Sequence, residues 1–260
     1  MIIRQYKLFA NWRKSFSKNF IYHYLSGSMA EKNLPEVENS EENLIIKLEE
    51  FLKIKNPKKI NLYLYPSLTL KKKDLGGTSP GFSRFEGRKI AYVYNKKFPK
   101  VATAHEETHL LCFEWDKPSS FIEKQYIIST ASFYEGLAMY TQSKFFNRYF
   151  NRYSLTARPP KGMTLSQAIK DDINNDRVPK IKDILMYEGY CKKLGNGAQL
   201  GSITEFLIEI YSLDKFRELF IKLSESNTQA KNESFFKTVY GKNIDTLDLE
   251  WRSYVVNKSD

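Results

Sequence analysis

The segment His105-Glu-Glu-Thr-His109 carries the residues best suited to chemistry in this chain. An α-helix turns once in about 3.6 residues, so two histidines four positions apart point to the same side and can both reach one metal ion at about 2 Å. Glu106 follows the first histidine, where its carboxylate could take a proton from a water bound to that metal. The spacing therefore predicts a zinc site with Glu106 as its general base.

A surface helix that happens to carry two histidines is the simpler alternative. The whole chain has 3 histidines, and two of them flank Glu106. The residues around the motif are mostly apolar or small, as in Val101, Ala102, Ala104, Leu110 and Leu111. This concentration favours the metal site over coincidence.

A catalytic zinc ion usually takes three protein ligands and leaves one position for water, so a further ligand is needed. Cys112 and Trp115 occupy the positions where a longer form of the motif would place its Gly and its third His. His23 lies in a β-branched and aromatic segment, which favours a strand histidine with a hydrogen-bond partner over a ligand. Glu135 is the remaining candidate because a carboxylate in the apolar run 133–140 needs a partner. A buried Glu135 that caps a helix or forms an ion pair is the alternative, and the residues by themselves leave it open.

The two motifs together resemble a known family. His105-Glu-x-x-His109 followed by Glu135-Gly-Leu-Ala is similar to the gluzincin metallopeptidases, the thermolysin-like MA peptidase domains. The helical patterns at 201–211 and 247–254 are similar to the helices that close such domains. The resemblance implies one Zn²⁺ per chain, held by His105, His109 and Glu135, with Glu106 as the base.

The hydrophobic patterns predict an α+β fold, with a small mixed sheet and the active-site helices followed by a mainly helical C-terminal subdomain. Alternating and β-branched runs predict strands at 20–25, 60–65 and 89–94. Helical spacing predicts helices at 36–55, from 101 to about 115, from 121 to about 146, and in a series of shorter segments between 164 and 256.

The irregular stretch 147–163, which is rich in Arg and Pro, predicts a boundary between two parts. Residues 1–146 would form a sheet-plus-zinc-helix subdomain, and residues 147–260 a helical subdomain that closes the cleft. The resemblance also implies that a sheet edge beside the zinc helix binds extended peptide through main-chain hydrogen bonds. Residues 89–94 could be that edge or an ordinary strand paired on both sides, and both interpretations stay open.

The chain has a net charge of +11, but its charges are scattered. The Lys clusters at 71–73 and 96–97 lack the pattern of a known nucleic-acid module, so they are interpreted as a solvated face and no specific nucleic acid is expected. Cys112, one of 2 cysteines with Cys191, is expected to be a buried thiol. No stretch is apolar enough for a transmembrane segment, which favours a cytoplasmic protein, or an exported one if an N-terminal signal has been removed. The oligomeric state stays open.

The leading hypothesis is a zinc-dependent metallopeptidase that hydrolyses peptide bonds through a metal-bound water. Glu106 would take the proton of that water and pass it to the leaving amine. Such enzymes usually add a Tyr or His donor for the oxyanion, and Tyr190, then Tyr187, are the candidates, although packing explains either. The alternatives are a zinc-stabilised binding or scaffold protein without turnover, which would not need Glu106, and a basic protein associated with nucleic acid.

Overall fold

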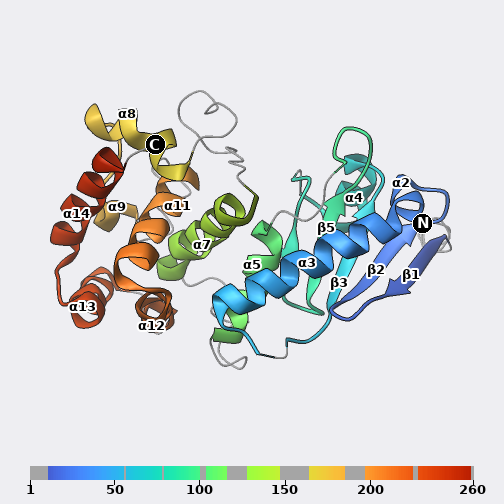
Figure 1. Ribbon diagram of the computed structural model, residues 1–260, viewed down its shortest axis with the longest axis horizontal. Coiled ribbons are helices and arrows are strands. Elements are labelled where there is room, and N and C mark those ends of the chain that lie inside the picture. Colours follow the sequence, from blue (N-terminus) through green and yellow to red (C-terminus); the bar gives the residue numbers. More distant parts are fainter. Residues whose placement is uncertain are drawn as a thin grey trace. The chain divides into compact units, whose positions relative to one another are not determined.

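The computed structural model describes residues 11–55, 57–77, 79–99, 104–115, 128–146, 164–184, 197–224 and 228–258. The chain divides into two compact units, residues 1–114 and residues 115–260. The first contains a five-stranded sheet, and the second is helical in the part that the structure describes (Figure 1), so the predicted α+β class is confirmed. The predicted division after residue 146 stays a prediction, because residues 147–163 lie outside the described residues.

The sheet has the strand order β1-β2-β3-β5-β4. Strands β2, β3 and β5 are parallel to one another, while β1 is antiparallel to β2 and β4 is antiparallel to β5. The predicted strands are confirmed as β2 (Phe20–Leu25), β3 (Ile60–Tyr65) and β5 (Lys89–Val93), and β1 (Trp12–Phe16) and β4 (Ser83–Arg84) complete the sheet.

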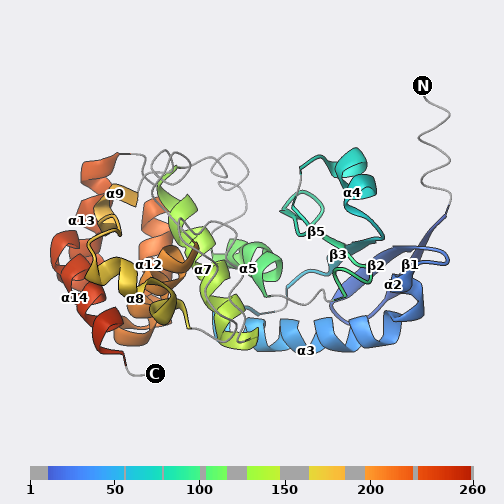
Figure 2. The same ribbon diagram turned by 90° about the horizontal axis from the view of Figure 1, so that it is seen from above.

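Helix α3 (Leu34–Leu52) runs along one side of the sheet, and α4 (Leu68–Leu75) lies on the other side (Figure 2). The short α2 (Met29–Lys32) precedes α3. Phe20, Tyr22 and Tyr24, at alternate positions of β2, are buried, and the period of two in a strand puts them on one face of the sheet. Polar contacts add to this packing, since the Asn19 backbone N–H and side-chain amide both donate to the Glu42 carboxylate at 2.7 Å.

The second unit is built from helices. They are α7 (Ile128–Phe146), α8 (Leu165–Asn174), α9 (Ile181–Ile184), α11 (Gly197–Phe206) with its π-helical continuation η3 (Leu207–Tyr211), α12 (Leu213–Ser224), α13 (Gln229–Tyr240) and α14 (Ile244–Asn257). Helices α7 and α11 approach closely at Gly136, where a Cβ atom would lie 2.6 Å from the Leu200 carbonyl oxygen. The lack of a side chain at Gly136 therefore permits this close helix packing.

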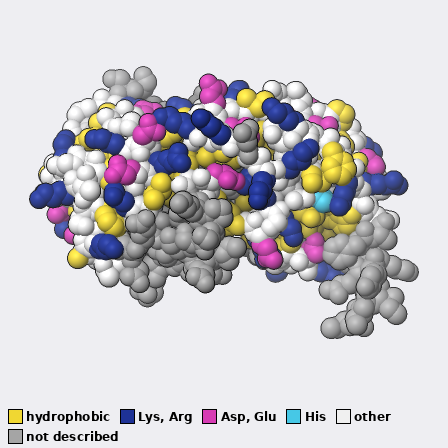
Figure 3. Space-filling model, turned by 90° about the horizontal axis from the view of Figure 1, so that it is seen from below, with side chains coloured by type: hydrophobic (Ala, Val, Ile, Leu, Met, Phe, Trp, Pro, Cys, Tyr) yellow, Lys and Arg dark blue, Asp and Glu magenta, His cyan; other side chains and the backbone are white. Residues whose placement is uncertain are grey.

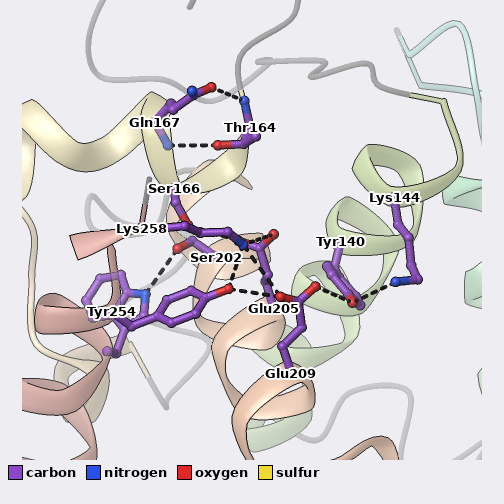
Figure 4. A network of polar contacts seen from close by, with 11 residues as sticks. Tyr140, Lys144, Thr164, Ser166, Gln167, Ser202, Glu205, Glu209, Tyr254 and Lys258 are labelled. Atoms are coloured by element: carbon purple, nitrogen blue, oxygen red, sulfur yellow. Dashed lines mark hydrogen bonds and ion pairs between the residues drawn. The ribbon is translucent and has the colours of Figure 1, made fainter. Parts of the chain in front are cut away.

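A polar network ties α7, α8, α11, η3 and the end of α14 together (Figure 4). The Glu205 carboxylate accepts a hydrogen bond from Ser166 at 2.9 Å and pairs with the Lys258 ammonium at 3.0 Å. One turn further on, Glu209 accepts a hydrogen bond from the Tyr140 hydroxyl at 3.2 Å. These contacts fix α7, the helix that carries Glu135, within its own unit.

One face of the molecule shows the same scattered charge as the sequence. On the face shown in Figure 3, Lys and Arg side chains are dispersed among acidic and uncharged ones rather than gathered in one patch. None of the described helices combines the length and the apolar character that crossing a bilayer requires.

Candidate metal centre

Helix α5 (His105–Leu111) carries the histidine motif and belongs to the first unit. It begins after Ala104, which has a φ of 66°, and continues as a 3-10 turn, η1 (Cys112–Trp115). A non-glycine residue in the left-handed region is uncommon and sets the direction in which the helix starts. The predicted helical motif is thus confirmed from residue 105 onward, and most of the helix is buried. Residues 101–103 lie outside the described residues.

The two histidines of α5 face each other. Their Nε2 atoms are 3.2 Å apart, and their ring planes are inclined at 86°. Two nitrogen ligands of a tetrahedral zinc ion with bonds of about 2.0–2.1 Å are separated by about 3.3 Å. The imidazoles of His105 and His109 therefore have the spacing of two ligands of one ion.

Glu135 joins the two histidines in a candidate group of three metal ligands. One oxygen of Glu135 and one nitrogen each of His105 and His109 all lie within 4.8 Å of one another. His109 is buried, and the other two side chains are half-buried. Among the described residues, no other group of three His, Cys, Asp or Glu side chains comes as close. Two imidazole nitrogens and one carboxylate oxygen form a donor set that fits a catalytic zinc ion and leaves one position open.

Glu106 lies beside Gly81, which is in the segment that leads into β4. A Cβ atom at Gly81 would be 2.7 Å from Glu106 Oε1 and 3.2 Å from Tyr92 Cε1. Gly81 therefore leaves the space that the Glu106 carboxylate occupies. This role cannot be recognised from the sequence, because Gly81 stands in a Pro- and Gly-rich stretch that is typical of any loop.

The edge of the sheet is not at residues 89–94. Strand β5 pairs with β3 on one side and with β4 on the other, and its Ala91 and Val93 N–H groups donate to Phe82 and Pro80 at 2.8 and 2.9 Å. The interpretation of 89–94 as an edge is wrong, and the ordinary paired strand is confirmed. In the described part of the chain, residues 80–84 form that edge instead. A strand of two residues preceded by Pro and Gly has no alternating pattern by which to recognise it.

Two buried carboxyl groups lie behind the motif. Glu107 of α5 accepts a hydrogen bond from the Tyr92 hydroxyl at 2.8 Å, and Glu41 of α3 is fully buried nearby. Burial raises the pKa of Glu107 to about 7, and burial together with the Glu107 charge raises the pKa of Glu41 well above its usual range. Glu107 therefore connects α5 to β5 and belongs to the interior, whereas Glu106 faces Gly81.

The remaining predicted residues have separate outcomes. His23 lies in β2 with its Nε2 2.9 Å from Asn61 Oδ1, and its ring stacks on Tyr63, as expected of a strand histidine. Cys112 is buried, as predicted. Tyr190, Tyr187 and Cys191 lie outside the described residues, so the proposed oxyanion donor stays a prediction.

No protein-family model matches the chain, and none of the curated proteins matches it. Among solved structures, it is similar to a crystal structure of a mutant M1 zinc metallopeptidase from Deinococcus radiodurans, with 12% sequence identity and a TM-score of 0.45. The match covers 96% of this chain and 52% of that chain, so this chain spans about half the length of that protein. A likeness this distant assigns no activity to the chain.

Proposed function

We propose that this chain is a zinc-dependent metallopeptidase, with His105, His109 and Glu135 as the metal ligands and Glu106 as the general base. One observation carries the proposal: three side chains of the right chemistry converge within 4.8 Å, and an acid follows the first histidine on the same helix. A purely structural zinc site is usually closed by four ligands and needs no acid beside it. This is why the zinc-stabilised scaffold is the weaker alternative.

Zinc, when bound, would supply the Lewis acidity that activates water and polarises the scissile carbonyl. The chain's own part of the reaction is proton transfer. Glu106 would take the proton from the attacking water and deliver it to the nitrogen of the leaving amine. Tyr190, or Tyr187, stays the proposed donor to the oxyanion, since the metal ion alone would stabilise it incompletely.

A peptide or protein is the proposed substrate because the motif helix lies beside a sheet edge. Segment 80–84 borders Glu106, and its hydrogen bonds to β5 use only one side of its backbone. An extended peptide can add to such an edge through main-chain hydrogen bonds. The charge on the face shown in Figure 3 is dispersed and offers no comparable support for a specific nucleic-acid partner.

Metal analysis combined with a peptide-library assay tests the proposal. Purified protein should contain about one zinc ion per chain, and the library should reveal cleaved peptides. The matched variant Glu106→Gln should keep its zinc, because Glu106 is not a ligand, and should lose about 10²-fold or more in kcat. A folded protein that binds no metal, or undiminished turnover by Glu106→Gln, would contradict the proposal.

A further inference from the structure

Lys71 is a buried lysine. Its exposed fraction is 1%, while its neighbours Lys72 and Lys73 on α4 are exposed. The interpretation of this lysine cluster as a solvated face is therefore wrong for Lys71. Lysine is almost never fully buried without partners, because removing its charge from water is costly. Its contacts should then show what the buried ammonium group is for.

The ammonium of Lys71 contacts both sides of Gly81. Its Nζ donates to the Ser79 carbonyl oxygen at 3.0 Å and lies 5.3 Å from the centre of the Phe82 ring. Ser79 and Phe82 lie on either side of Gly81 in the sequence. Gly81 is the residue at which an added Cβ atom would clash with Glu106. Lys71 therefore holds the stretch of backbone that borders the proposed base.

Helix α4, which carries Lys71, is itself fixed to the sheet. Its first turn is capped by the Ser67 side chain, which accepts from the Leu70 N–H, and its Asp74 accepts a hydrogen bond from the Tyr65 hydroxyl of β3. The segment that Lys71 contacts has weaker support. It follows Gly76 and Gly77, both with positive φ, and β4 itself is two residues long.

We propose that Lys71 is a positioning residue that keeps the sheet edge 80–84 ready to receive the main chain of a peptide. The inference rests on the proposed peptidase function. If the edge holds its receiving conformation for only a fraction of the time, the apparent affinity for substrate falls by that fraction. A bound peptide would itself order the edge, so the loss appears in KM rather than in kcat.

Lys71→Met tests this role, because Met keeps much of the apolar stem and removes the ammonium. Losing a charge-assisted hydrogen bond should raise KM about tenfold and change kcat by less than about threefold. Zinc content should not change. The Ala91 and Val93 amides, which donate to Phe82 and Pro80 of the edge, should exchange hydrogen about tenfold faster or more. Lys71→Arg, which keeps a charged donor, should recover part of the KM, and Lys72→Met should match the wild type.

The outcomes separate this inference from the proposed function. If the wild type cleaves peptides and Lys71→Met leaves both KM and the exchange of the two amides unchanged, the role of Lys71 is refuted and the peptidase stands. A fall in kcat with unchanged KM refutes it as well. If the wild type cleaves no peptide, the proposed function fails, and unchanged amide exchange would refute the role of Lys71 independently. Should Lys71→Met not fold, Phe82→Leu serves in its place, with the same rise in KM expected and an unchanged KM as the refuting result.

Discussion

Gly81 and Glu106 lie so close that a methyl group on Gly81 would come within 2.7 Å of Glu106 Oε1. Gly81, which has no side chain and lies in the sheet edge, thus limits where the Glu106 carboxylate can lie. The φ of Gly81 lies outside the left-handed region, so a larger residue could adopt its backbone conformation there. The lack of a side chain at this position matters for space, not for backbone freedom.

Gly81→Ala should therefore displace Glu106 while leaving the backbone intact. We expect kcat/KM to fall about tenfold to 10²-fold, because a general base must lie within hydrogen-bond reach of its proton. Zinc content and the melting temperature should change little. Steady-state kinetics with a peptide from the library assay measure this effect.

A double-mutant cycle provides the control. In a Glu106→Gln background, Gly81→Ala should cause little further loss, because the two changes act on the same group. If the two losses multiply independently, Gly81 acts by some route other than Glu106.

Glu135→Ala should weaken zinc binding at least about tenfold, since it removes a proposed ligand next to the histidine pair. Competition with a chromophoric chelator measures the affinity. Glu209→Ala is the matched control, because Glu209 is a carboxylate of the second unit that lies in the network of Figure 4 instead. Equal zinc affinity of Glu135→Ala and wild type would mean that the third ligand lies elsewhere.

Gly136→Ala should destabilise the fold by about 1–3 kcal/mol, because overpacking forces helices apart. The added Cβ atom would meet the Leu200 carbonyl oxygen at 2.6 Å, and backbone of a packed helix yields little. At Gly197, the corresponding contact is 3.1 Å to the flexible end of Met139, so Gly197→Ala should cost less. Urea unfolding of the two variants measures the difference, and equal stability would show that α7 and α11 have room to separate.

The stability of the protein should fall in mild acid partly because of His23. Burial, together with the nearby charges of Lys14 and Lys89, lowers the pKa of His23 in the folded state. The unfolded chain then binds a proton at a higher pH, about 6.5, than the folded protein does. The contribution of His23 is therefore fully present above that pH and is lost as the pH falls through the window below it.

His23→Phe tests this effect, because Phe can keep the stacking on Tyr63 and does not titrate. Urea unfolding at pH 8 and pH 5 should show a smaller loss of stability for the variant than for the wild type. Comparing the two proteins cancels the titration of their other groups. The same loss in both would show that His23 is not a source of the pH dependence.

Much of the site could be predicted from the sequence because its spacing is local. A helix places His105 and His109 on one side whatever surrounds it, and β-branched runs mark β2, β3 and β5. The edge was not predictable in this way, since β4 is defined by pairing with β5 and not by its own two residues. The burial of Lys71 is not predictable for a related reason: three consecutive lysines look equivalent in sequence, and tertiary contacts select which one is buried.

The parallel pairing of the sheet has a consequence for how the protein forms. Phe20 of β2 pairs with Ile60 of β3, and Asn61 pairs with Lys89 of β5, so each register joins residues far apart along the chain. Large loops must close before these ladders yield any stabilisation, whereas helices that follow one another can associate early. We therefore expect formation of the sheet to be the slower step in refolding. The histidine pair would then acquire its final surroundings only when the sheet is complete.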